Sequence, residues 1–321
     1  MTRRFINEFA PQETVNEVFL ASDKQLRSNR QGSLYLQVQL RDRTGAIGAR
    51  LWNANEEIGR RFDNGDFVRV EGSTQLFQGA MQMIATKIVK AAPGDVDEAD
   101  FAVLGSTDID KLAVRLAEML RTMTNPHLAA LAEAYLADEA FMQKFATSPA
   151  GVKNHHAHRG GLIEHVVNLM EIVVRIADRY PKIDRDLLLM GAFLHDSGKV
   201  DELTYQRDFG YSDHGQLLGH IVLAMEEIQG KVIEAGKLNG EPLPDDLVLR
   251  LKHMIVSHHG SQEFGSPTVP MTLEAIALHH LDNLDAKIHH FEQLLRDDAN
   301  VDSHWTQYHP NIGRKLYKGP G

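Results

Sequence analysis

The chain has 321 residues, enough for two or three domains, and a formal net charge of −10. It contains no cysteine, which excludes disulfides and thiolate metal sites, so any bound metal has nitrogen and oxygen ligands. It has no apolar run long enough for a membrane span or a signal peptide, so we expect a cytoplasmic protein without a membrane partner.

The charge is unevenly distributed along the chain. Residues 1–92 contain 13 Lys and Arg against 10 Asp and Glu, which leaves 21 of the 34 basic and 34 of the 44 acidic residues for the remainder. The first part is therefore mildly basic, as a polyanion-binding domain would be. The remainder is strongly acidic, as metal-binding carboxylates would help to make it.

Residues 13–90 have the pattern of short β-strands. The expected strands cover 14–22, 34–40, 46–52, 66–71 and 81–89. A turn at 41–45 joins the second strand to the third, and 75–79 joins the last two. Five short strands with one longer connection near 53–64 fit a small barrel of the oligonucleotide/oligosaccharide-binding (OB) type.

These strands carry aromatic and basic side chains. Aromatic rings stack on unpaired bases and arginines contact phosphates, so the pattern favours binding of a single-stranded nucleic acid. The candidate residues are Tyr35, Trp52, Phe77 and Arg50. The open alternative is that the rings fill the barrel and the arginines are ordinary surface charges.

A connector and two helices follow the barrel. Residues 91–107 contain Pro, Gly and several acidic residues without sustained periodicity, which predicts a linker. Residues 108–123 have helical spacing, and Asn125-Pro126 starts a second helix that is expected to run to about residue 145. We expect both helices to cover the part of the chain that carries the chemistry.

Residues 187–203 form an apolar helix with a charged end. Its helical spacing ends at His195-Asp196, and Ser197-Gly198-Lys199 then breaks the pattern. Charged groups at the end of a buried helix cost free energy unless they are neutralised, and a divalent cation bound by imidazole and carboxylate neutralises them. The pair therefore predicts a metal site, and the alternative is a helix that simply reaches the surface.

The histidines favour the metal site. All 17 lie at or beyond His127, and 16 fall between His155 and His309. The candidate ligands, each on or at the end of an expected helix, are His165, His195, Asp196, His220, His258, His259 and Asp282. We predict two cations that share Asp196, with His165, His195 and Asp282 at one and the remaining three histidines at the other. The alternative is a set of core histidines that bind nothing.

Other polar residues are candidates for supporting roles. Lys199, just outside the helix, is placed to meet a phosphate oxygen, or else to act as a cation at the helix end. The loop 152–161 offers phosphate contacts, unless it is only solvated: His155, His156, His158 and Arg159. His214 is a further candidate, and His279, His280 and Asp285 are expected to orient ligands.

The motifs HHAHRGGLIEH, FLHDSGK, GQLLGH, SHHGSQEFGSP and LDNLDAK resemble those of HD-domain metal-dependent phosphohydrolases, from about Lys153 to His290. Together with the barrel, the chain resembles the YhaM family of 3′-to-5′ exoribonucleases. The resemblance implies an enzyme that trims single-stranded RNA, or alternatively single-stranded DNA, to nucleoside monophosphates. The implied cofactor is Mn²⁺, with Mg²⁺, Fe²⁺ and Co²⁺ as alternatives.

We therefore predict an α+β multidomain protein in which a five-stranded OB-type barrel precedes an all-α HD bundle. The expected domains are 1–90 (OB fold), 91–107 (linker), 108–150 (helical lead-in) and 151–321 (HD phosphohydrolase, core 153–290). Two other functions stay open: a nucleotide or cyclic-dinucleotide hydrolase with a regulatory barrel, and a non-enzymatic single-strand-binding factor. Assembly into a homo-oligomer is also left open.

Overall fold

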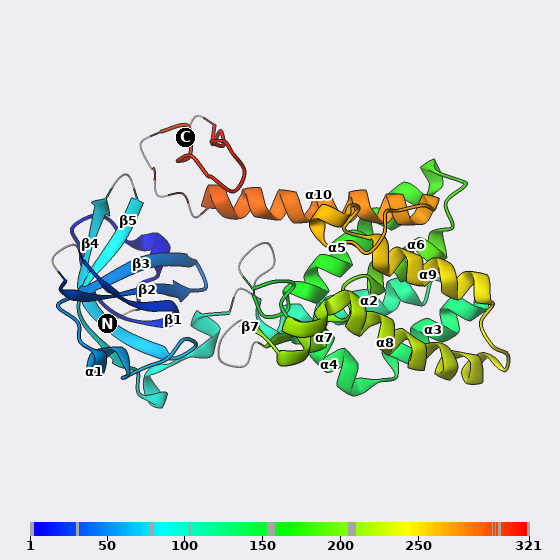
Figure 1. Cartoon of the computed structure of the whole chain (residues 1–321), viewed down its shortest axis with the longest axis horizontal. Helices are drawn as coiled ribbons and strands as arrows, with labels where there is room; N and C mark the ends of the chain where they lie inside the picture. The colour runs from blue at the N-terminus through cyan, green and yellow to red at the C-terminus, as the bar shows by residue number, and fades with distance from the viewer. Residues whose placement is uncertain are drawn as a thin grey trace. The chain divides into compact units, whose positions relative to one another are not determined.

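The computed structural model (Figure 1) describes residues 3–29, 32–77, 80–102, 104–152, 158–204, 210–296, 298, 300 and 303–319. The chain forms two compact units. The barrel unit contains residues 1–103, 206–208 and 291–321, and the helical unit contains residues 104–205 and 209–290. The expected lead-in helices therefore belong to the helical unit, whereas the last residues of the expected HD domain group with the barrel.

The barrel unit confirms the predicted five-stranded OB-type fold. Its strands are β1 (Thr14–Ser28), β2 (Leu34–Asp42), β3 (Gly45–Trp52), β4 (Phe67–Phe77) and β5 (Ala80–Lys90), with a short helix α1 (Glu56–Gly59) between β3 and β4. The strand order β1-β2-β3-β5-β4 closes because β1 pairs antiparallel with both β2 and β4, and β3 pairs parallel with β5. The expected turn at 75–79 is wrong in part, since β4 continues to Phe77.

Alternation along the strands separates the barrel core from its outer surface. On β2, Leu36, Val38 and Leu40 are buried, while the residues between them are partly exposed. Successive strand side chains point to opposite faces, so one face of each strand fills the barrel. Phe19 and Phe62 complete this core. The side chains on the other face are left to interact with a ligand or with solvent.

The helical unit contains nine helices in its described residues, and α10 ends in the barrel unit. They are α2 (Ser106–Leu120), α3 (Pro126–Leu136), α4 (Glu139–Thr147), α5 (Gly161–Ile176), α6 (Arg185–Leu194), α7 (Lys199–Glu202), α8 (Asp213–Asn239), α9 (Asp245–Ser257) and α10 (Leu273–Arg296), with a two-stranded sheet of β6 (Leu203–Thr204) and β7 (Gly210–Tyr211). Where one helix was expected over 125–145, Asp138 caps a separate α4 by accepting a hydrogen bond from the Phe141 amide. No helix in the described part of the chain is both long and apolar enough to cross a bilayer.

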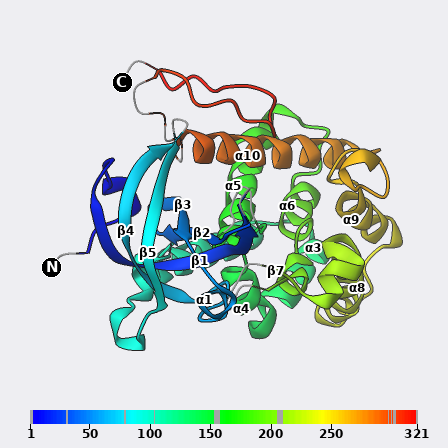
Figure 2. The ribbon, with the colours of Figure 1, turned by 60° about the vertical axis from the view of Figure 1, so that its left-hand side comes forward.

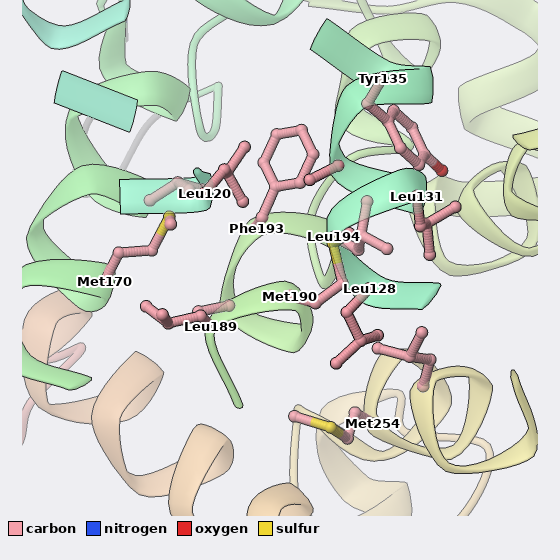
Figure 3. Close-up of a cluster of buried hydrophobic side chains, with 14 of the residues drawn as sticks. Leu120, Leu128, Leu131, Tyr135, Met170, Leu189, Met190, Phe193, Leu194 and Met254 are labelled. Atoms are coloured by element: carbon pink, nitrogen blue, oxygen red, sulfur yellow. The ribbon is translucent and has the colours of Figure 1, made fainter. Parts of the chain in front are cut away.

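Helix α6 lies at the centre of this unit, between α5 and α9 (Figure 2). Every residue from Asp186 to Leu194 is buried, and Phe193 packs edge-to-face on Tyr135 of α3 at 5.4 Å between ring centroids (Figure 3). Burial of each large apolar side chain contributes roughly 1.5–3 kcal/mol. This packing fixes the end of α6, where His195 and Asp196 follow.

Candidate functional site

Five segments of the helical unit bring the seven predicted ligands together. These are His165 on α5, His195 and Asp196 after α6, His220 on α8, His258 and His259 after α9, and Asp282 on α10. Their side chains form two clusters. In each cluster, one candidate ligand atom from every residue lies within 4.8 Å of the others. The clusters are His165 with His195 and Asp282, and His220 with His258 and His259.

Asp196 lies between the two clusters. Its Oδ2 is 3.3 Å from His195 Nε2 in the first cluster. Its Oδ1 is 3.5 Å from His220 Nε2 and 3.7 Å from His258 Nε2 in the second. The two oxygens of one buried carboxylate therefore face different clusters, so Asp196 could contribute one ligand atom to a cation at each of them.

Backbone carbonyls orient two of the imidazoles. His195 Nδ1 donates a hydrogen bond to the Ala192 carbonyl at 2.9 Å, and His258 Nδ1 donates to the Ile255 carbonyl at 2.7 Å. A carbonyl oxygen can only accept, so the proton of each neutral ring is on Nδ1. The lone pair is then on Nε2, which faces the clusters.

Buried carboxylates orient two more imidazoles. His165 Nδ1 lies 2.7 Å from Asp285 Oδ2, and His220 Nδ1 lies 3.1 Å from Glu202 Oε1. Asp285 was among the residues that the sequence predicts to orient ligands, whereas Glu202 was not predicted. The only available signal was an acidic residue in the segment directly after the His195-Asp196 pair.

Several ligand atoms at the centre are buried without a hydrogen-bond partner among the described residues. They are Asp196 Oδ1, His220 Nε2, His258 Nε2 and His259 Nδ1. Buried polar atoms are nearly always satisfied, because an unsatisfied one carries the full cost of desolvation. Imidazole and carboxylate lone pairs directed at a common centre are the donor set of a divalent cation, so these residues fit a metal centre.

Electrostatics favour the protonation states that a metal needs. Burial opposes ionisation of Asp196, but Lys199 and His195 outweigh it and hold the pKa of that carboxyl well below its ordinary value. Burial, assisted by His195, holds the pKa of the His258 imidazole well below its ordinary value. An ionised carboxylate and a neutral imidazole are the binding forms of these ligands.

His165 has the opposite shift. Burial alone would lower the pKa of His165, but hydrogen bonds with Asp282 and Asp285 outweigh it and raise the pKa to about 9. The same pairing lowers the pKa of Asp282, even though burial opposes ionisation of this carboxyl. A cation bound at this cluster would therefore have to displace a proton that two carboxylates hold on the imidazole.

Lys199 lies outside α6, as predicted, and begins the short helix α7. Its Nζ is 2.6 Å from Asp196 Oδ2, and only 13% of its side chain is exposed. Burial lowers the pKa of the Lys199 ammonium, but Asp196 outweighs this effect and raises it. The ammonium is thus a fixed positive charge against the Asp196 carboxylate.

The histidine-rich loop is only partly described. His155 and His156 lie outside the described residues, so their predicted phosphate contacts stay a prediction. His158 Nε2 is 3.1 Å from Glu164 Oε2, and Arg159 is exposed. Neither of these two side chains is part of the ligand clusters.

Three histidine candidates remain. One of them, His279, contacts a segment that carries a predicted ligand, and the other two do not. His279 Nδ1 donates to the His258 carbonyl at 2.8 Å, which holds the segment that carries a ligand. Gly260 packs against the His279 ring so closely that a Cβ there would lie 2.1 Å from the imidazole. His214 and His280 are exposed and belong to neither cluster.

Glycines shape the backbone beside His220. Gly219 has φ 76° and ψ 158° inside α8, a conformation that is essentially restricted to glycine, so the helix is kinked immediately before the ligand. A Cβ on Gly198 would lie 2.0 Å from the His220 carbonyl oxygen. The segment after Asp196 therefore packs backbone to backbone against α8, which the sequence analysis did not predict.

The barrel has an exposed aromatic face. Tyr35 and Trp52 are directly opposite on β2 and β3, with ring centroids 5.1 Å apart. The Arg50 guanidinium lies 5.6 Å from the Phe77 ring centroid. Trp52 and Phe77 are 44% and 45% exposed, so these two rings do not fill the barrel. We call these four residues the barrel face.

Family models match both units. Residues 162–287 match the HD domain, and residues 22–91 match an OB-fold nucleic acid binding domain. A solved structure of the second OB-fold domain of replication protein A from Methanococcus maripaludis is 26% identical over 28% of this chain and 94% of its own, with a TM-score of 0.22. The two family models, with the ligand clusters, define an HD-domain metal-dependent phosphohydrolase joined to an OB-fold domain.

Curated relatives extend over most of the chain. The 3′-5′ exoribonuclease YhaM of Geobacillus sp. (strain WCH70) is 36% identical over 265 residues, which are 82% of this chain and 79% of the relative. The YhaM protein of Oceanobacillus iheyensis is 36% identical over 258 residues, with 80% and 79% covered. The chain belongs to the YhaM family of 3′-5′ exoribonucleases.

Proposed function

We propose that this protein hydrolyses single-stranded RNA from the 3′ end to nucleoside monophosphates, with two divalent cations at the ligand clusters. The observation that carries the proposal is the position of Asp196, whose two oxygens face two separate clusters. A closed structural site needs about four ligands, and this centre offers seven: the six residues of the two clusters and Asp196. The proposed substrate and direction of cleavage are based on the relatives, which are 3′-5′ exoribonucleases.

The ligand chemistry favours a transition metal over Mg²⁺. Five imidazoles and two carboxylates are available, whereas Mg²⁺ prefers oxygen ligands. The choice of Mn²⁺ over Fe²⁺ and Co²⁺ rests on the resemblance to the YhaM family. When bound, two divalent cations polarise the scissile phosphodiester and lower the pKa of water. Asp196 would join both sites, with His165, His195 and Asp282 at one and the other three histidines at the second.

The chain's own groups have distinct tasks in this scheme. Glu202 and Asp285 hold the protons of His220 and His165 on Nδ1, which keeps Nε2 directed at the centre. Lys199 pairs with Asp196 and adds a fixed positive charge at the site where a phosphate would bind.

The barrel face is the proposed binding site for the single strand. Its exposed rings offer stacking surfaces to unpaired bases, and Arg50 offers a cation to a phosphate. These contacts do not distinguish RNA from DNA, so single-stranded DNA is a second substrate to test.

The test uses single-stranded RNA labelled at the 5′ end, incubated with the full chain and Mn²⁺. We expect a ladder that shortens from the 3′ end and stops at a stable hairpin, because each base-pair step costs about 1.4 kcal/mol to open. Asp196→Asn keeps the shape of the side chain but removes the shared charge, so turnover should fall by orders of magnitude.

A circular single strand of the same sequence is the control for direction. It has no terminus, so it should survive while its linear form is degraded. Cleavage of both at similar rates would mean an endonuclease. Near-normal turnover by a folded Asp196→Asn variant would remove Asp196 from the metal centre.

A further inference from the structure

The segment after α10 has no role in the functions described above. Residues 303–319, which we call the terminal hairpin (red in Figure 1), contain two antiparallel bridges, one of them between Trp305 and Tyr317. The Thr306 amide donates to the Leu316 carbonyl, and the Leu316 amide donates to Thr306 Oγ1, both at 2.9 Å. Thr306 and Leu316 are buried, so the hairpin has an inner side that holds its shape.

The outer side of the hairpin carries aromatic rings. Trp305, Tyr308 and Tyr317 are 49%, 58% and 57% exposed. The Trp305 and Tyr317 rings pack against each other at 5.0 Å between centroids and leave about half of their surface to solvent. Backbone hydrogen bonds hold the segments that carry these rings. The rings are therefore a preformed stacking surface, because the backbone loses little conformational entropy on binding.

The hairpin is basic in an acidic chain. It contains three Lys and Arg and no Asp or Glu, whereas the whole chain has a net charge of −10. Lys318 is paired with Asp298 at 2.8 Å. Arg314 and Lys315 are exposed and have no ion pair within the part of the chain that the structure describes. Two positively charged side chains beside three exposed aromatic rings are complementary to a polyanion with accessible bases.

We propose that the terminal hairpin is a second binding site for single-stranded RNA, separate from the barrel face. Trp305 and Tyr317 stack on unpaired bases, while Arg314 and Lys315 contact phosphates. A duplex does not fit this chemistry, because its bases are already stacked on one another. The proposal rests on the proposed function only for the choice of RNA as the polyanion.

The test uses the fact that the chain has two tryptophans, Trp52 and Trp305. In full-length protein, Trp52→Phe keeps an aromatic ring on the barrel face and leaves Trp305 as the fluorescent reporter. Asp196→Asn in the same chain prevents hydrolysis during the titration. We expect single-stranded oligouridylate to quench Trp305 emission to saturation, with an affinity that falls as salt rises.

Charge variants then test the phosphate contacts. In this reporter, Arg314→Gln with Lys315→Gln should make the slope of log affinity against log salt less steep by about 1.4, about 0.7 for each phosphate contact removed from a single strand. Lys182→Gln with Lys237→Gln removes the same charge from exposed positions of the helical unit and should leave the Trp305 titration unchanged.

Two results would overturn the proposal. The first is constant Trp305 emission at RNA concentrations where the anisotropy of labelled RNA shows saturated binding. The second is emission that follows protein concentration rather than RNA, with dimers in sedimentation, because the hairpin would then bind a second copy. If RNA quenches Trp305 emission in the reporter but the unsubstituted protein has no nuclease activity, the hairpin site is supported and the proposed function is rejected.

Discussion

Glu202 determines which nitrogen of a neighbouring ligand faces the metal centre. Its Oε1 accepts hydrogen bonds from the His220 backbone amide at 3.0 Å and from His220 Nδ1 at 3.1 Å. Burial opposes ionisation of Glu202, but His220 outweighs it and lowers the pKa of the carboxyl. The carboxylate is thus ionised, and it keeps the His220 proton on Nδ1.

We therefore expect Glu202→Gln to weaken the second cluster selectively. The amide keeps the size of the side chain but loses the charge-assisted hydrogen bond, and loss of such a partner costs about 10–100-fold in metal affinity. Metal titration of the purified protein should show one site weakened and the other retained. Asp201→Asn, at the exposed neighbouring position, is the control. Equal metal affinity in both variants would mean that Glu202 only fills space.

Glu227, which is not one of the predicted metal ligands, should make the free energy of unfolding depend on pH. Burial, assisted by Asp201, raises the pKa of this carboxyl to about 8. The ordinary value is 4.5, so between these two pH values the folded chain retains a proton that the unfolded chain has lost. The free energy of unfolding should then fall as pH rises through this window.

Glu227→Gln removes this effect because an amide does not ionise. At about pH 8 the variant should unfold at a higher temperature than the parent, and at about pH 4, where both states of Glu227 are protonated, the difference should vanish. Thermal unfolding followed by circular dichroism measures both. Glu226→Gln changes an exposed carboxylate on the same helix and should show no such trend. A pH-independent difference would contradict the shifted pKa.

At the scale of elements, the kink in α8 is the feature on which the second cluster depends. Gly219 interrupts the helix with a positive φ immediately before His220. Alanine in this conformation costs about 1–3 kcal/mol. Gly219→Ala should therefore either lower the free energy of unfolding by that amount with turnover retained, or straighten α8, displace His220 and reduce turnover.

Gly230 provides the matched control for this substitution. It lies on the same helix, and a Cβ there would meet no atom within 4 Å. Gly230→Ala should stabilise the protein by about 0.5–1 kcal/mol, since alanine favours the helix. Chemical denaturation and metal content separate the two glycines. A Gly219→Ala variant that behaves like Gly230→Ala would show that the kink is dispensable.

The elements also show what the sequence could and could not predict. The ligands on successive helices were predictable, because an imidazole or carboxylate beside an apolar helical stretch needs a partner. The ends of elements were not: alternation continues through β4 to Phe77, and only the cap at Asp138 separates α3 from α4. Glu202 was missed because its role depends on a tertiary contact with α8, which no local pattern encodes.

At the scale of the whole molecule, the proposed strand-binding face and the ligand clusters belong to different units. The barrel face is part of the basic first portion of the chain, and the ligand clusters lie in the acidic helical unit. Acidic surroundings disfavour a polyanion through long-range repulsion, so a strand is expected to bind more readily at the basic first portion of the chain than on the acidic helical unit. Affinity for a long strand and turnover of a small phosphodiester should therefore respond to different substitutions.

Trp52→Ala with Phe77→Ala tests this separation. Stacking contributes about 1–3 kcal/mol per base, so KM for long single-stranded RNA should rise by roughly 5- to 150-fold per ring. Hydrolysis of bis(p-nitrophenyl) phosphate, which has no bases, should be unchanged. Tyr180→Ala removes an equally exposed ring from the helical unit and is the control. An unchanged KM would place the strand elsewhere.

The shared carboxylate has a last consequence for heat tolerance. The ligands join chain segments from residue 165 to residue 282, and the chain has no cysteine with which to join them covalently. A cation held by several of these segments acts as a reversible cross-link that closes long loops of the polypeptide, much as a disulfide would. The durability of this fold would then depend on the free metal concentration around it.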